Sequence, residues 1–201
     1  MDRISQMNKT ELRHFFKARR ASLNIDEVSQ RSRQINQNFI DNLLPKIYKK
    51  NSAKIFSLYL SSYNEVSTEV IAQHFSKNGI RFSYPKIVQK NHPLDFILAD
   101  KLQTLKPNQF FQKIFEPVDG KKVHPDFIIL PLLAFDPDLS RLGMGGGFFD
   151  RTIECLKRQN SAIITIGLGY QFQRSGEIMY TENTDQRLDF VVTEKIIFSP
   201  S

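Results

Sequence analysis

Short apolar runs alternate along the chain with segments in which apolar residues recur every three or four positions. Runs of about four to eight apolar residues are typical of buried strands. We expect strands at residues 53–60, 80–84, 94–98, 127–133, 162–168 and 190–193. Residues 99–122 have a mixed character and are expected to be partly loop.

The segments with helical periodicity begin and end at residues that suit helix termini. Asn8, with Glu11 three positions later, forms a capping box for a helix that runs to about Ala21. Further helices are expected at residues 25–47, which have a polar outer face, at 67–78 and at 148–158. Gly79 directly follows residue 78 and suits the left-handed C-cap of that helix.

The order of these elements predicts the fold class. Strands that alternate with helices predict an α/β fold, with a mostly parallel sheet and helices on both faces. The chain has no internal repeat, low-complexity tract or linker, so we expect a single domain over residues 1–201. Ligands of such sheets bind beyond the carboxyl ends of the strands. Residues 60–65 and a glycine-rich segment, residues 143–147, both follow predicted strands, so we expect them on the same rim of the sheet.

The glycine-rich segment is the most informative feature of the chain. Glycine lets a ligand approach the backbone closely, and the N-terminus of a helix attracts anions. Arg141 and Arg151 flank the glycines and can neutralise phosphate, while Asp150 can hold Mg²⁺ on a nucleotide. The segment lacks the lysine of a P-loop and the glycine spacing of a dinucleotide fingerprint. A flexible surface loop is the alternative, which the paired arginines and the aspartate disfavour.

Composition narrows the class of partner. The net charge is +7 and the isoelectric point about 9.5, which fits either nucleic acid or a polyanionic small molecule. The basic residues are dispersed, without the basic and aromatic pattern of an RNA-binding module, so we favour the small molecule. No apolar stretch is long enough to span a bilayer, residues 1–6 carry no apolar leader, and Cys155 is the single cysteine. We therefore expect a cytoplasmic monomer that binds neither nucleic acid nor a membrane.

Several charged side chains outside the glycine segment have two interpretations each. Lys9 and Arg13 lie four residues apart on one helix face, with Arg20 near it, and form either a binding face or a solvated basic stripe. Glu65 follows a strand and is either a ligand contact or an acid in the first turn of the next helix. Asp185 lies in a polar loop and is either a metal ligand or a solvated acid.

Taken together, these segments resemble the 5-formyltetrahydrofolate cyclo-ligase (5,10-methenyltetrahydrofolate synthetase) family from about Lys9 to Thr193. The glycine and arginine motif is the most specific part of the match. The segments that match the family pattern are Lys9-Thr10-Glu11-Leu12-Arg13, Glu65-Val66-Ser67-Thr68, Glu116-Pro117, Ala134-Phe135-Asp136, Arg141 to Arg151, Gly167 to Gln173 and Asp185. The departures are Phe148-Phe149 in place of Tyr-Tyr, Leu139 in place of Gly, Tyr180 in place of Pro, and Thr184 in place of His.

The resemblance implies an ATP- and Mg²⁺-dependent enzyme that converts 5-formyltetrahydrofolate to 5,10-methenyltetrahydrofolate with release of ADP and phosphate. ATP phosphorylates the formyl oxygen, N10 attacks the activated carbon, and phosphate leaves. Arg141 and Lys9 are implied to be catalytic, and Asp150 and Asp185 to bind the metal. The implied ATP-binding residues are Lys9, Arg13, Arg141, Leu142, Gly143, Met144, Gly145, Gly146, Gly147, Phe148 and Phe149. The implied folate-binding residues are Leu60, Glu65, Arg13, Met144 and Phe148.

Two other functions stay open at this point. The change from Tyr-Tyr to Phe148-Phe149 also fits a catalytically silent relative that binds a folate or a nucleotide. The basic charge fits an RNA-binding protein, although the positive residues of the motif lie beside glycine turns and acids, and acids repel RNA phosphate. Turnover of 5-formyltetrahydrofolate with Mg-ATP distinguishes the enzyme from the silent relative.

Overall fold

An eight-stranded sheet forms the centre of the computed structural model, which describes residues 7–50, 52–99 and 104–200. The strand order is β12-β11-β10-β7-β1-β2-β3-β6. The consecutive strands from β11 to β2 are parallel. At one edge β12 pairs antiparallel with β11, and at the other β3 pairs antiparallel with β2 and β6 pairs antiparallel with β3. The strands are β1 Ile55–Ser57, β2 Arg81–Lys86, β3 Asp95–Leu98, β6 Lys122–Val123, β7 Phe127–Pro131, β10 Ile164–Leu168, β11 Phe190–Val192 and β12 Ile197–Phe198.

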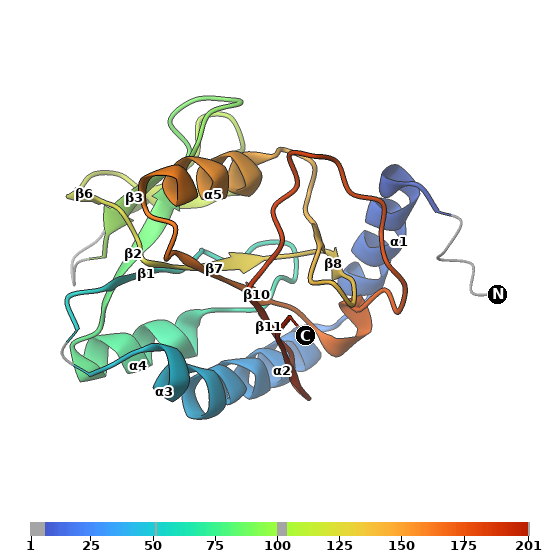
Figure 1. Ribbon diagram of the computed structural model, residues 1–201, viewed down its shortest axis with the longest axis horizontal. Coiled ribbons are helices and arrows are strands. Elements are labelled where there is room, and N and C mark those ends of the chain that lie inside the picture. The colour runs from blue at the N-terminus through green and yellow to red at the C-terminus, as the bar shows by residue number, and fades with distance from the viewer. Residues whose placement is uncertain (1–6, 51, 100–103, 201) are drawn as a thin grey trace.

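Helices cover both faces of this sheet, which confirms the predicted fold class (Figure 1). One face is covered by α2 Ile25–Asn38, which continues through a π-helical turn Phe39–Leu43 into α3 Leu44–Ile47, and by α4 Glu69–Asn78. The other face is covered by α5 Phe148–Gln159. The first helix, α1 Lys9–Ala21, lies at one end of the sheet beside β8 Ala134–Phe135.

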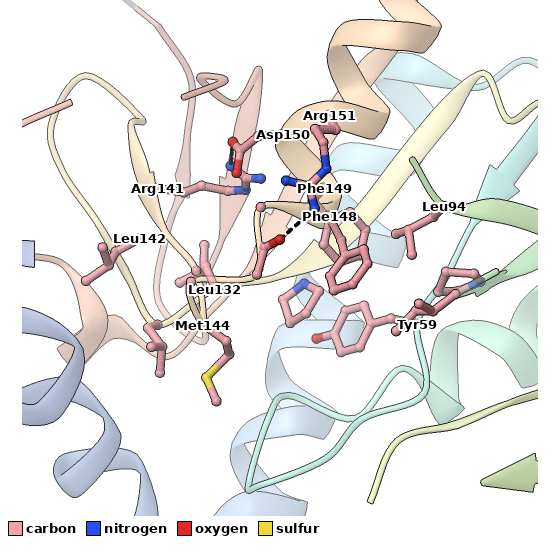
Figure 2. Close-up of a pocket in the computed structure, with 18 of the residues that line it drawn as sticks. Tyr59, Leu94, Leu132, Arg141, Leu142, Met144, Phe148, Phe149, Asp150 and Arg151 are labelled. Carbon is pink, nitrogen blue, oxygen red and sulfur yellow. Dashed lines mark hydrogen bonds and ion pairs between the residues drawn. The ribbon is translucent and has the colours of Figure 1, made fainter. Parts of the chain in front are cut away.

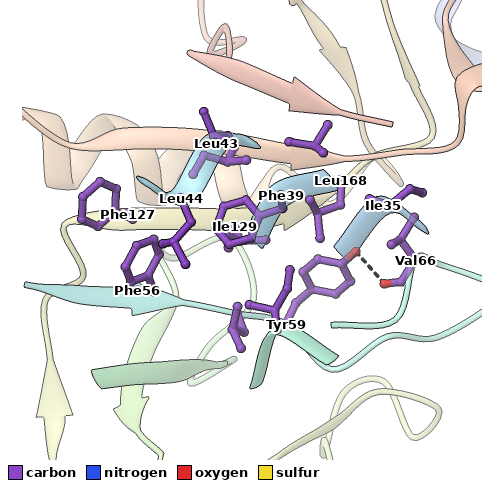
Figure 3. Close-up of a cluster of buried hydrophobic side chains, with 14 of the residues drawn as sticks. Ile35, Phe39, Leu43, Leu44, Phe56, Tyr59, Val66, Phe127, Ile129 and Leu168 are labelled. Carbon is purple, nitrogen blue, oxygen red and sulfur yellow. Dashed lines mark hydrogen bonds between the residues drawn. The ribbon is translucent and has the colours of Figure 1, made fainter. Parts of the chain in front are cut away.

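The alternation of side chains along β7 explains why both faces need a cover. Phe127 and Ile129 point into the core beneath α2, α3 and α4, where Phe39 and Phe56 also pack (Figure 3). Ile128 and Leu130 belong to the separate core beneath α5. A strand that is apolar at every position is therefore buried on both sides, as expected for a central parallel strand.

The predicted helix termini agree with the structure at the two positions where the sequence contains a capping motif, the start of α1 and the end of α4. The side chain of Asn8 accepts hydrogen bonds from the backbone of α1, and Glu11 completes the capping box. Gly79 ends α4 in the left-handed conformation, with φ 66°. The range predicted as one helix, 25–47, contains a π-helical turn that ends one residue before the Leu44-Pro45 pair, and Pro45 has no N–H to continue the α-helical ladder.

Other boundaries differ for local reasons. The predicted strand 53–60 is regular only at Ile55–Ser57, because the chain then curves toward α4 and Thr68 donates its hydroxyl to the carbonyl of Tyr59. Thr68 is the N-cap with a non-helical backbone, so α4 begins at Glu69, two residues later than predicted. The predicted strand 127–133 ends at Pro131, as the missing N–H of proline requires.

Two antiparallel hairpins and both edge strands of the main sheet, β6 and β12, were missed. One hairpin pairs β8 with β9 Arg141–Leu142, so the glycine segment follows β9 and not the long strand β7. The other pairs β4 Leu105–Pro107 with β5 Phe115–Pro117. Strands of two or three residues are too short to show a hydrophobic period. Part of the mixed range 99–122, at 100–103, lies outside the described residues, as do residues 1–6, where no leader was expected.

The connections out of β1 and β7 run in opposite directions across the sheet. From β1 the chain passes through α4 to β2, and from β7 it passes through the β8–β9 hairpin and α5 to β10, on the other side. Neighbouring strands that diverge in this way leave a crevice at their carboxyl ends, which is where α/β sheets bind ligands. Among the described residues, no helix combines the length and the apolar character needed to cross a membrane.

Candidate functional site

A cavity of about 620 Å³ opens at the carboxyl ends of β1, β2 and β7. Its volume lies within the range of small-molecule sites. The structure brings all of the residues predicted for the site to its wall, from the glycine segment, from α1, from the segment after β1 and from the loop before β11. They are Lys9, Arg13, Leu60, Glu65, Arg141, Leu142, Gly143, Met144, Gly145, Gly146, Gly147, Phe148, Phe149, Asp150 and Asp185.

The glycine segment forms one end of the cavity between β9 and α5. Gly145 and Gly147 have φ of 98° and 64°, conformations that side-chain-bearing residues rarely adopt. Gly147 precedes α5, and no side chain caps the first N–H groups of that helix. Backbone donors at an uncapped helix start suit an anion such as phosphate.

Two arginines hold the loop through its carbonyl groups. Arg13 on α1 donates from Nε to the carbonyl of Gly143 over 3.2 Å. Arg151 on α5 donates to the carbonyl of Gly146 over 2.6 Å and lies across the ring of Phe148, 5.3 Å from its centroid. The loop is therefore fixed from both of its neighbouring helices.

Arg141 is buried at this end of the cavity and paired with Asp150. Its side chain is only 4% exposed, and Nη1 lies 2.8 Å from Oδ1 of Asp150 (Figure 2). Burial lowers the pKa of Arg141, while the charges of Asp150 and Asp185 oppose this effect. Because arginine titrates far above neutral pH, the guanidinium stays charged. The cavity thus contains a permanent cation with restricted access to water, which strengthens its attraction for an anion.

Lys9 forms a second ion-pair group beside the first. Its Nζ lies 2.6 Å from Oδ2 of Asp185 and 3.0 Å from Oε1 of Glu182. Burial alone would lower the pKa of Lys9, but the hydrogen bonds to both carboxylates outweigh it and raise that pKa. The pKa of Asp185 is lowered, since the bonds from Lys9 and from the backbone of Glu182 outweigh the effect of burial. Both groups are therefore charged at neutral pH.

Glu65 lies on a different wall of the cavity and is buried. Its Oε2 accepts hydrogen bonds from the N–H and the hydroxyl of Ser62, at 3.0 and 3.3 Å. Burial raises the pKa of Glu65, and the charge of Arg20 and the bonds from Ser62 partly offset that rise. The alternative of a first-turn helix acid is wrong, because α4 begins at Glu69 and Glu65 precedes it.

Arg20 is a cavity residue that the sequence-based prediction did not include. It is 3% exposed, and its Nη2 lies 3.8 Å from Oε1 of Glu65. The alternative of a solvated basic stripe is therefore wrong for Arg20. Its position in the sequence carried a signal, since Lys9, Arg13 and Arg20 follow one another at spacings of one and two helical turns.

Apolar side chains fill the wall between the two charged regions. Tyr59 and Leu132 follow β1 and β7, and Leu94 and Phe148 line the same wall (Figure 2). The β4–β5 hairpin adds Phe115 and the buried carboxylate of Glu116, which accepts hydrogen bonds from Asn108 and the N–H of Ile87. An apolar middle with polar groups at separate ends suits a flat ligand with localised polar atoms.

Asp150 and Asp185 fit a magnesium ion held together with phosphate. In each carboxylate one oxygen accepts the hydrogen bonds of a base and a backbone N–H, and the other accepts none from the described residues. Among the described residues, no three His, Cys, Asp or Glu side chains converge as a metal site of their own. Mg²⁺ is commonly held by one or two carboxylates plus substrate phosphates, so this donor set suits it.

Comparison with known proteins decides the family. The model of the 5-formyltetrahydrofolate cyclo-ligase family matches residues 5–194. The chain belongs to the 5-formyltetrahydrofolate cyclo-ligase family. A cyclo-ligase of this name from Haemophilus influenzae is 32% identical over 90% of this chain and 92% of its own length. Another, from Mycoplasma pneumoniae, is 30% identical over 94% of this chain and 100% of its own.

Solved structures of the family share the fold. A 5,10-methenyltetrahydrofolate synthetase from Mycoplasma pneumoniae superposes with a TM-score of 0.70 at 29% identity, covering 94% of this chain and 100% of that one. The Aquifex aeolicus 5,10-methenyltetrahydrofolate synthetase gives a TM-score of 0.77 at 28% identity, covering 96% and 93%. Within this family the chain has Phe148 where the expected pattern has tyrosine. That ring makes an edge contact with Phe111, with centroids 5.9 Å apart, which requires no hydroxyl.

Proposed function

We propose that this protein is an ATP- and Mg²⁺-dependent 5-formyltetrahydrofolate cyclo-ligase, which forms 5,10-methenyltetrahydrofolate, ADP and phosphate. The observation that supports this most is the shared cavity. The glycine segment with its cations and the buried carboxylate of Glu65 come from distant parts of the sequence, and both line that cavity.

The glycine end is proposed to bind the triphosphate of ATP. Backbone N–H groups of residues 143–147 and of the first turn of α5 face the phosphates, and Arg141 and Lys9 neutralise charge as the γ-phosphoryl group moves. Lys9 is held by Asp185 and Glu182, so it exchanges partners when the nucleotide enters. Arg13, which orients the loop at Gly143, also contributes positive charge.

The other end is proposed to bind the pterin. Its amino and ring N–H groups are donors, and a carboxylate is an acceptor, so Glu65 is the complementary partner. Leu60, Met144 and Phe148 supply apolar contact to the flat ring system. This arrangement directs the formyl group toward the glycine end, where the phosphoryl donor lies.

The proposed chemistry depends on positioning more than on a reactive side chain. A formyl amide oxygen is a weak nucleophile, and phosphorylation converts it into a leaving group. N10 of the folate then attacks the activated carbon, the ring closes and phosphate departs. The enzyme must hold two ligands in line and stabilise the charge that develops, which are the roles proposed for Arg141 and Lys9. No covalent enzyme intermediate is needed.

Asp150 and Asp185 are the residues proposed to hold Mg²⁺. When bound, the ion would neutralise negative charge on the phosphates. Asp150 also orients Arg141 through its other oxygen, and Asp185 does the same for Lys9.

The test is the appearance of methenyl absorbance when the protein is mixed with Mg-ATP and 5-formyltetrahydrofolate. We expect absorbance to rise with time and to require all three components. A catalytically silent relative would bind the ligands in separate titrations and give no absorbance change. Absence of both binding and turnover would refute the proposed function altogether.

A further inference from the structure

The cavity contains a buried arginine to which the proposed chemistry assigns no role. Arg20 lies on α1, and its guanidinium has three close partners among the described residues. Nη1 donates to the carbonyl of Leu132 over 3.3 Å, and Nη2 lies 3.9 Å from the sulfur of Met144 and 3.8 Å from Oε1 of Glu65. A buried charge is costly unless an opposite charge accompanies it. Of these three partners, only Glu65 carries one.

The distance between the two groups matters as much as their charges. At 3.8 Å the contact is longer than a hydrogen bond, so Oε1 of Glu65 keeps its capacity to accept one. The other oxygen, Oε2, is already engaged by Ser62. The carboxylate is therefore fixed through one oxygen, balanced in charge by Arg20, and left with the second oxygen able to receive a ligand donor.

The two residues are also tied together through the backbone. Asn64, directly before Glu65, donates from its side chain to the carbonyl of Arg20 over 3.2 Å and to that of Leu23 over 2.9 Å. Asn64 adopts a left-handed conformation, with φ 58°. The end of α1 is thus joined to the segment that carries Glu65.

We propose that Arg20 is a positioning residue for Glu65, which keeps that carboxylate ionised and turned toward the N–H donors of the pterin. This inference rests on the proposed function, because it takes the pterin as the ligand of Glu65. Arg20 acts through Glu65 and takes no part in phosphoryl transfer.

The electrostatic surroundings give the inference a measurable consequence. The titratable and charged groups that face Glu65 are Arg20 from α1 and Tyr59 from the segment after β1, with Tyr170 behind Tyr59. The hydroxyl of Tyr59 donates to the carbonyl of Val66, and burial raises the pKa of Tyr59 well above its usual value, so it remains neutral. Burial also raises the pKa of Glu65, and among the described residues Arg20 is the cation that opposes this rise.

The sign of the pH effect follows. Folate binding needs ionised Glu65, so affinity is present above the pKa of that group and is lost as pH falls through it. Removing Arg20 raises this pKa further, and the loss then begins at a higher pH. An opposite charge at this distance shifts a carboxyl pKa by about one unit or more, so we expect the midpoint to move by a similar amount.

The experiment is a titration of 5-formyltetrahydrofolate against the full-length protein over a pH series. Wild type is compared with Arg20→Met, Arg20→Lys and the matched control Arg19→Met. Arg19 is the exposed neighbour of Arg20 on the same helix, and it contacts Phe172 rather than the cavity. Titration of Mg-ATP against each variant reports whether the fold and the nucleotide end are intact. Glu65→Gln tests whether Glu65 is the group that titrates, because the folate affinity of this variant should not change with pH over the acid range.

We expect Arg20→Met to bind Mg-ATP as wild type does, and to lose folate affinity at a midpoint about one pH unit higher. Arg20→Lys should lie between Arg20→Met and wild type, and Arg19→Met should match wild type. An unchanged midpoint and an unchanged affinity in Arg20→Met overturn the inference. If wild type binds no 5-formyltetrahydrofolate at any pH, the proposed function itself is wrong and the inference falls with it.

A failure of Arg20→Met to fold is also decisive when the double variant Arg20→Met/Glu65→Gln is made. Breaking a buried pair is destabilising, whereas neutralising both partners removes the uncompensated charge. A folded double variant beside an unfolded single variant supports the pairing. If both are unfolded, Arg20 serves the fold independently of Glu65, and the inference is overturned.

Discussion

The two ends of the cavity are built on different physical principles. At the glycine end, cations and carboxylates are already paired with one another, and Met144, Gly145 and Gly146 are exposed. At the Glu65 end, one carboxylate is buried beside one buried arginine, and its geometry is fixed by Ser62 and Asn64. The glycine end must exchange partners when a charged ligand enters, whereas the Glu65 end is complete beforehand.

This difference predicts how each end responds to change. A site assembled from paired charges and bare backbone should depend on the metal and on each cation. A preorganised carboxylate should govern one ligand and leave the other unaffected. The following experiments test this contrast, beginning with the largest expected effect.

Removal of the metal should abolish turnover. EDTA is expected to eliminate methenyl formation and added Mg²⁺ to restore it, since the carboxylate and phosphate oxygens of the glycine end repel one another without a cation. Asp150→Asn should raise the Mg²⁺ concentration needed for half-maximal rate, measured by titrating Mg²⁺ in the absorbance assay. Binding of 5-formyltetrahydrofolate should survive EDTA. A rate indifferent to EDTA contradicts the metal role of Asp150 and Asp185.

Loss of the buried cation should be nearly as severe. Arg141→Ala is expected to lower kcat by about 10²- to 10³-fold, the usual effect of deleting one preorganised electrostatic contact in a transition state. The matched control is Arg158→Ala, an arginine 77% exposed on α5 and paired with Glu154. Because Arg141 is buried, thermal unfolding of both variants must be followed beside the kinetics. A wild-type rate in Arg141→Ala would falsify the assignment.

The backbone of the glycine segment should be sensitive to any side chain. Gly145→Val places a branched side chain at φ 98°, within 3.5 Å of Arg13, where the phosphates are proposed to lie. We expect Mg-ATP affinity to fall by about tenfold or more, because relief of about 1–3 kcal/mol of strain moves the loop out of its binding conformation and the side chain also blocks the backbone. Gly176→Val is the control, since it has a comparable φ of 79° and open space around it. Equal effects of the two substitutions on Mg-ATP affinity point to strain alone.

Neutralising Glu65 should separate the two ligands. Glu65→Gln keeps the size of the side chain and removes its charge, so folate affinity should fall by about one to two decades, the worth of a charge-assisted hydrogen bond. Affinity for Mg-ATP should stay as in wild type. Separate titrations of each ligand measure both values. An unchanged folate affinity would contradict the proposal that Glu65 accepts hydrogen bonds from the pterin.

The smallest effect is expected at Glu182, the exposed partner of Lys9. Glu182→Gln removes a contact of 3.0 Å made by a side chain that is 58% exposed, and exposed ion pairs contribute about 0.2–1 kcal/mol. Mg-ATP affinity should therefore change by a few-fold at most, whereas Asp185→Asn should reduce it strongly. Equal losses in the two variants show that Lys9 needs both carboxylates, and that Asp185 has no separate role.

The fold was predictable from the sequence where periodicity and capping were strong. The buried strand Phe127–Pro131 and the capping box of Asn8 and Glu11 are examples, since each depends on neighbouring residues alone. The two-residue strands β8 and β9 depend on a pairing across the chain that no local pattern records. The same limit explains why the glycine segment was placed after the wrong strand.

The candidate site was predictable in many of its members but not in its pairings. Every residue that the glycine motif and the family resemblance assigned to the site lies on the cavity wall. They did not reveal that Arg141 is buried, that Lys9 is shared by two acids, or that Arg20 faces Glu65. Each of these facts joins elements far apart in the chain, and tertiary packing alone sets such distances.

The central claim is that one cavity holds both ligands at once, each at its own end. The most direct measurement is a calorimetric titration of 5-formyltetrahydrofolate into protein saturated with a non-hydrolysable ATP analogue and Mg²⁺. We predict that one folate binds per chain with undiminished affinity, in a ternary complex with the nucleotide. Competition, in which the analogue reduces the apparent folate affinity in proportion to its concentration, would contradict the claim.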